Sequence, residues 1–163
     1  MSSHLPAAQA VALDMEVLRQ FRIIFRSVRK HFQIVENRVG LRGSLLWALS
    51  IVAEQPGIRL TRLAGAMAVH QSTASNLLAR LIELDLVRKE RNTRDNRVAG
   101  LYVTETGRSR LAQAPGPLRG LLPDALQKLP EDTLAELHGD LQLLLEQMET
   151  LETKGEGIPL ADL

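Results

Sequence analysis

Apolar residues recur at alternating spacings of three and four along the N-terminal part of the chain, at Leu18, Phe21, Phe25, Val28, Phe32, Val35 and Val39. This spacing is typical of a helix whose apolar face packs along another helix. A second series of the same kind follows a helix-start signal at 130–133, at Leu134, Leu137, Leu141, Leu144, Met148 and Leu151. Either series packs within its own domain or joins two subunits. Their position at both ends of a middle segment that is complete without them favours the second interpretation.

The middle segment has the pattern of several short helices. We expect a helix over 44–54, a break at 55–59, a short helix opened by Thr61, whose hydroxyl would cap it, and a third helix soon after. Small residues, Ala64 and Ala68, stand where the last two helices must approach each other. The third helix has apolar residues on one face, and the opposite face is small and polar, with Ser72, Ser75, Asn76 and Ala79. Two helices joined by such a tight turn are typical of a helix-turn-helix.

Strand-like alternation follows this helix. Leu86 and Val87 begin an extended run, and after a polar loop Ala99, Leu101 and Val103 alternate with their neighbours, which predicts a two-stranded hairpin. Thr104 is then expected to cap a helix that runs until the Pro-Gly-Pro at 115–117.

Charge is concentrated at the hairpin. Five of the ten residues over 88–97 are basic, although the whole chain carries a formal net charge of only +1. Residues 57–110 hold ten basic and five acidic side chains, whereas residues 111–163 hold three and ten. A basic middle beside an acidic end indicates an anionic partner for the middle segment.

The remaining composition excludes several classes of protein. With no cysteine, disulfides, cysteine-rich zinc sites and thiol redox sensing are all excluded. No export signal and no apolar run of about eighteen residues is present, so we expect a cytoplasmic protein that does not enter a membrane. The four histidines show no metal-ligand spacing, and the chain has no phosphate loop, nucleophile elbow or paired carboxylates. We therefore expect no metal site, no cofactor and no enzymatic activity.

The stretch QSTASNLLARLIELDLVRKERNTRDNRVAGLYVTETG resembles the MarR family of bacterial winged helix-turn-helix regulators. The family has a recognition helix, then a wing with an Asp-x-Arg element, here Asp95-Asn96-Arg97, and then a Leu-Thr-x-x-Gly exit, here 103–107. One departure is Asp85, where the family usually has a glycine. Asp tolerates the left-handed conformation expected there.

The resemblance implies a mainly α fold with a small two- to three-stranded β wing, and a winged helix-turn-helix lobe flanked by N- and C-terminal dimerisation helices. We expect a single domain over 1–163. Within it the DNA-binding lobe would span about 44–110 and the dimerisation helices about 11–40 and 111–153, with a flexible tail over 154–163.

Site residues follow from the polar helix face and the wing. Short polar side chains suit base edges in the major groove, and arginines suit phosphates and a narrow minor groove. The resemblance implies that Asp95 orients Arg97. The predicted DNA-binding residues are Ser72, Thr73, Ser75, Asn76, Arg91, Arg94, Asp95 and Arg97.

The expected function is a homodimeric repressor of a palindromic double-stranded DNA operator, relieved by a small ligand. The resemblance implies a ligand of a kind that is often aromatic. The resemblance implies a ligand cleft between the lobe and the dimerisation helices, with Trp47, Phe25 and Phe32 as conceivable walls, although each of them fits a core position better. The alternative is a winged-helix module that binds a partner protein and reads no DNA. Five cations in the wing argue against that alternative.

Overall fold

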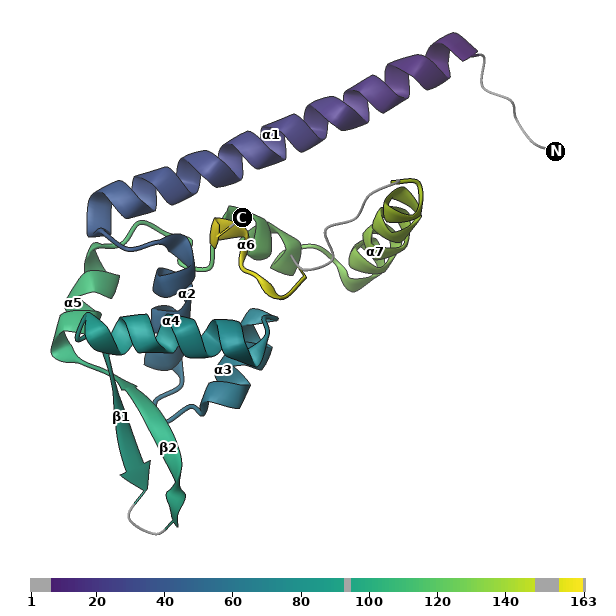
Figure 1. The fold of residues 1–163 in the computed structure, drawn as a ribbon. Coiled ribbons are helices and arrows are strands. Elements are labelled where there is room, and N and C mark those ends of the chain that lie inside the picture. The colour runs from purple at the N-terminus through teal and green to yellow at the C-terminus, as the bar shows by residue number, and fades with distance from the viewer. Residues whose placement is uncertain (1–6, 93–94, 149–155, 163) are drawn as a thin grey trace.

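The computed structural model describes residues 7–92, 95–148 and 156–162. For residues 7–11, 92 and 95–98 it describes the backbone alone. One long helix, α1 (Ala7–Val39), runs along the top of the molecule, and the lobe with its hairpin hangs below its C-terminal end (Figure 1). The helix begins earlier than Leu18, because the preceding residues Ala7 to Val17 are good helix formers.

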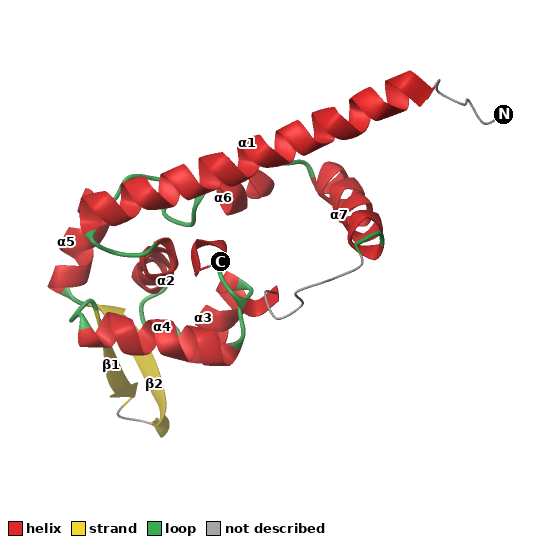
Figure 2. Cartoon of the chain, turned by 45° about the horizontal axis from the view of Figure 1, so that its top comes forward, coloured by secondary structure: helices red, strands yellow, loops and turns green. Residues whose placement is uncertain are grey.

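Four helices and the hairpin make the lobe. These are α2 (Gly43–Glu54), α3 (Leu60–Met67), α4 (Gln71–Glu83), the strands β1 (Val87–Asn92) and β2 (Asp95–Val103), and α5 (Glu105–Gln113). Three more elements follow the lobe: α6 (Leu121–Gln127), α7 (Glu131–Glu146) and a short 3-10 turn, η2 (Leu160–Asp162). Helix α6 lies beneath α1 (Figure 2). The expected fold class, mainly helical with a small β wing, is confirmed.

The core of the lobe is aliphatic, as the composition requires. Its most deeply buried side chains come from α2, α3, α4 and the strands: Leu46, Leu49, Leu63, Leu78, Leu81, Leu86 and Leu101. Helix α2 lies at the centre and is buried along nearly its whole length, whereas α4 buries only one face. The core therefore fixes which side of α4 meets solvent.

Two positive-φ residues end the helices of the helix-turn-helix. Asp85 follows α4 with a φ of 57°, so aspartate does occupy the left-handed position where a glycine is usual in the family. Ala68 ends α3 with a φ of 53°. Ala68 is therefore an exposed helix end, and of the two alanines expected at the close approach only Ala64 is buried.

The predicted caps have mixed outcomes. Thr104 caps α5 as expected, because its hydroxyl accepts a hydrogen bond of 3.0 Å from the Gly107 amide. The prediction for Thr61 was wrong: α3 begins at Leu60, its N-cap residue is Arg59, and that cap makes no side-chain hydrogen bond. Thr61 therefore lies inside the first turn.

The hairpin is anchored to the lobe at its base. β1 and β2 pair antiparallel from Val87–Val103 to Arg91–Ala99. Ile58 adds an isolated antiparallel bridge to Leu101, so a single residue stands where a third strand would pair. Gly100 allows this close approach, since a Cβ there would lie 3.1 Å from the Gly57 Cα.

Candidate nucleic-acid interface

Helix α4 presents a small polar face on the surface of the lobe. Its residues Ala74, Leu77, Leu78 and Leu81 are buried against the core, and Ser72, Ser75 and Asn76 are exposed on the other side. The core-facing leucines thus hold the predicted readout residues outward, and these short side chains allow the helix to approach a groove closely.

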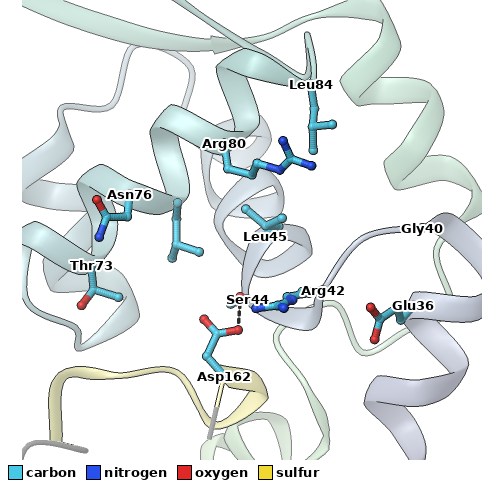
Figure 3. Close-up of a pocket in the computed structure, with 11 residues that line it drawn as sticks. Glu36, Gly40, Arg42, Ser44, Leu45, Thr73, Asn76, Arg80, Leu84 and Asp162 are labelled. Carbon is cyan, nitrogen blue, oxygen red and sulfur yellow. Dashed lines mark hydrogen bonds between the residues drawn. The ribbon is translucent and has the colours of Figure 1, made fainter.

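Two of the predicted residues lie at the edge of a cavity. Thr73, which is half-buried, and Asn76 line a space of about 560 Å³ between α4 and the junction of α1 with α2. Figure 3 shows Thr73, Asn76 and Arg80 along α4 above Ser44 and Asp162, which close the other side. A molecule bound in this cavity would contact the same helix that is proposed to meet DNA.

Arg80 was not among the predicted site residues. It lies four residues after Asn76 on the same edge of α4, and its Nη1 donates a hydrogen bond of 2.7 Å to Glu83. The helical spacing 73, 76 and 80 could have identified it, since residues three and four apart lie on the same side of a helix. Arg42, at the end of the α1–α2 connection, lines the same cavity and was also missed.

The wing residues are described to different degrees. Arg91 is exposed on β1. Arg94 lies outside the described residues, and Asp95 and Arg97 lie on β2 with their backbone described and their side chains not. Their contribution to an interface stays a prediction.

Arg88 has partners within the hairpin itself. Its guanidinium forms an ion pair with Glu90 and lies 5.5 Å from the centre of the Tyr102 ring, over its face. An arginine held on an aromatic ring stabilises the hairpin. Among the described basic side chains of the wing, Lys89 and Arg91 are therefore better placed than Arg88 to meet a phosphate.

The two helices at the chain ends expose large apolar side chains. Phe25 of α1 is 66% exposed and Leu143 of α7 is 61% exposed, and α7 has no buried residue. Helices α1, α6 and α7 line an apolar groove of about 540 Å³. In this groove Phe21 and Phe25 stack with ring centres 6.1 Å apart. The C-terminal end of the first apolar series is buried, with Val35 only 1% and Val39 only 3% exposed.

The three aromatic residues suggested as cleft walls are not together. Phe32 and Trp47 are half-buried and line one cleft with Met67, whereas Phe25 lies in the α1–α7 groove. The core position favoured for Phe25 was therefore wrong for the single chain.

Other chemistry is not evident in the part of the chain that the structure describes. Over residues 7–92, 95–148 and 156–162, no group of three or more His, Asp or Glu side chains is arranged to hold a metal ion. Within the same ranges, no helix is both long enough and apolar enough to cross a bilayer.

Comparison with known proteins agrees with this geometry. Residues 45–99, from α2 to the second strand, match the model of the MarR family. Over this segment, about one third of the chain, the sequence is similar to the MarR family. No curated protein has a significantly similar sequence.

Several solved structures of transcriptional regulators share the fold. Sco3205, a MarR family transcriptional regulator from Streptomyces coelicolor solved in complex with DNA, is 19% identical with a TM-score of 0.54, over 93% of this chain and 94% of that one. The regulator BldR from Sulfolobus solfataricus is 24% identical with a TM-score of 0.51, over 85% and 98%. The regulator SlyA is 22% identical with a TM-score of 0.52, over 80% and 92%.

The match to the MarR-family model indicates the coarse function. The family consists of DNA-binding transcriptional regulators, and the match supports this class for the chain. Regulators of this family are not enzymes, so the match also supports the expectation that the chain has no catalytic activity.

Proposed function

We propose that the protein is a homodimeric, sequence-specific regulator in which α4 enters the major groove and the wing contacts the flanking backbone or minor groove. The observation that carries this proposal is the exposed face of Ser72, Ser75 and Asn76, held outward by the core beside a basic hairpin. Thr73 and Asn76 lie on the cavity side of the same helix. Base-edge contacts select a sequence, and phosphate contacts position the protein.

The dimer is supported by the exposed apolar surfaces of α1 and α7. A monomer would leave in water, among others, Phe25, Leu141, Leu144 and Met148, which line grooves of about 540 and 780 Å³. Exposed apolar patches of this kind mark interaction sites. Two copies joined there would present two recognition helices, and a palindromic operator would place their half-sites ~34 Å apart.

The proposed mode of action is repression relieved by a small molecule. The cavity of about 560 Å³ is within the range of small-ligand sites, and it touches both α4 and the α1–α2 junction. A ligand held there would change the angle between the lobe and α1, and thus the separation of the two recognition helices. Its charged lining, with Arg42, Arg80 and Glu36, favours a polar ligand over a purely aromatic one. The cytoplasmic location stays a prediction.

The test of sequence-specific binding is a selection of DNA from a random pool by the purified protein. We expect a palindromic consensus with half-sites about one helical turn apart. Enrichment of a single, non-repeated site would contradict the symmetric dimer, and no enrichment at all would favour the protein-binding module.

The wing is tested with Arg97→Ala on the selected operator. If Arg97 of both subunits contacts phosphates, the slope of log affinity against log salt should become shallower by roughly 1.8, at ~0.9 per contact. Asp95→Ala should reproduce part of the defect, because it removes the orienting partner and keeps the cation. Lys128→Ala, which removes an exposed cation from the C-cap of α6, is the control and should bind normally. Unchanged affinity and slope for Arg97→Ala would argue that the wing binds no DNA.

A further inference from the structure

Residues 156–162 lie in the cleft between the lobe and the helices above it. In Figures 1 and 2 this segment runs beside α2 and α6, although it follows α7 in sequence. Successive side chains alternate: Gly157 and Pro159 are buried and Ala161 is half-buried, whereas Glu156 and Leu160 are exposed. Small residues therefore face the protein, as a shallow cleft requires, in a stretch where the sequence predicts a flexible tail.

The segment is held at both ends by hydrogen bonds. The His70 amide donates to the Gly157 carbonyl over 3.2 Å, and His70 is the N-cap residue of α4. At the other end, the Ser44 hydroxyl donates to the Asp162 carboxylate over 2.9 Å. Ser44 is only 1% exposed, so this contact satisfies a buried hydroxyl.

Asp162 also supplies charge that α2 lacks. The first turn of α2 contains no acidic residue, and its N-cap, Arg42, makes no side-chain hydrogen bond. A carboxylate at this end of a helix is favoured by the unpaired amides and by the helix dipole. The tail therefore completes the start of one helix through Asp162 and contacts the start of another through Gly157.

Packing in the cleft is close. A Cβ at Gly157 would overlap the imidazole ring of His70, and a Cβ at Gly43 would lie 3.1 Å from the Ala161 Cβ. The walls are Phe32, Trp47 and Met67, and about 170 Å³ of space remains beside the tail. The cleft is thus mostly filled by the chain itself.

We propose that residues 156–162 are an intramolecular occupant of this cleft, which docks there in the free protein and positions the start of α4. The docked tail bridges α2 and α4 across the cleft. A molecule too large for the remaining space must displace the tail to enter the cleft beside Trp47, and displacement releases His70 at the start of the recognition helix.

Docking is tested through Trp47, the only tryptophan in the chain. Pro159→Asp places a charge on a buried position of the tail, and Leu160→Asp places the same charge on the next residue, which is 41% exposed. In the full-length protein, we expect Pro159→Asp to shift Trp47 emission to the red and to increase its quenching by acrylamide. Leu160→Asp should have a much smaller effect. Equal effects of the two variants, or none, would overturn the docked arrangement.

A second pair of variants tests the contact with α4. Gly157→Ala adds a methyl group against His70, and Gly139→Ala adds one on α7 where no atom lies within 4 Å. Faster amide exchange at the start of α4 in Gly157→Ala, with no change in Gly139→Ala, is the expected result. Unchanged exchange in both variants would refute the positioning of α4 by the tail.

The effect on DNA rests on the proposed function and is measured separately. If the docked tail preorganises α4, Pro159→Asp should weaken operator binding by about fivefold or more, the usual lower range of coupling between two sites. Wild-type affinity in a variant whose Trp47 is exposed would refute the coupling to DNA. If no variant and no wild-type protein selects DNA, the proposed function fails, and the Trp47 and exchange results still decide whether the tail docks.

Discussion

Replacing Phe25 with alanine tests whether the exposed side of α1 is a subunit interface. Burying a phenylalanine side chain fully is worth about 1.5–3 kcal/mol. Because Phe25 is 66% exposed in the single chain, pairing of two copies can bury about two-thirds of this amount, or roughly 1–2 kcal/mol per subunit. The dimer contains two such residues, so the variant should lose about 2–4 kcal/mol of association free energy.

At about 1.4 kcal/mol per tenfold change, this loss raises the dimer dissociation constant by about 30- to 700-fold. Sedimentation velocity over a concentration series measures the constant, and circular dichroism checks that the helices remain. Ile82→Ala is the matched control, because Ile82 is 38% exposed on α4 and lies in the lobe. A wild-type chain that sediments as a folded monomer, or an unchanged constant for Phe25→Ala, would refute the assignment of this face.

Three further substitutions test the lobe. Asn76→Ala should weaken binding to the selected operator by about 1–3 kcal/mol and relax the preference at one position per half-site, measured by binding to operator variants. The control Asn37→Ala, at an exposed position of α1, should change neither. An equal loss of affinity for all sequences would mean that Asn76 contacts the DNA backbone. Ala68→Gly should stabilise the fold by up to about 1 kcal/mol in urea unfolding, because it relieves a φ of 53°, and a destabilised variant would contradict that strain. Gly107→Ala should destabilise the fold by about 1–3 kcal/mol, because its Cβ would overlap the Leu86 carbonyl oxygen, and wild-type stability would contradict the overlap.

Much of the lobe could be predicted from local sequence patterns. The two faces of α4 follow from the spacing of Ala74, Leu77 and Leu81, since a helix that packs one face on a core must leave the other in solvent. The left-handed Asp85 and the cap at Thr104 are also local, because each depends on a few neighbouring residues.

What sequence patterns missed depends on contacts between distant segments. Nothing in the stretch around Pro159 is periodic, and its burial depends on a cleft made by α1, α2 and α3. Helix α6 is too short for a recognisable apolar period and carries Pro123 in its first turn. The cavity edge at Thr73 and Arg80 likewise exists only because the α1–α2 junction lies opposite α4.

Thr104 joins three elements at one residue. Its hydroxyl donates to the Asp85 carbonyl over 2.6 Å and accepts from the Gly107 amide, and its own amide donates to the Leu86 carbonyl over 3.0 Å. The end of α4, the exit of the hairpin and the start of α5 therefore cannot rotate independently. The recognition helix and the wing therefore move as one rigid body. A change in the spacing of the operator half-sites cannot be accommodated by bending the wing relative to the helix. The rotation must instead take place at the connection between α1 and α2, where Gly40 has a φ of 67°. Substitutions there should change which operator spacings are tolerated and leave the preferred bases of each half-site unchanged.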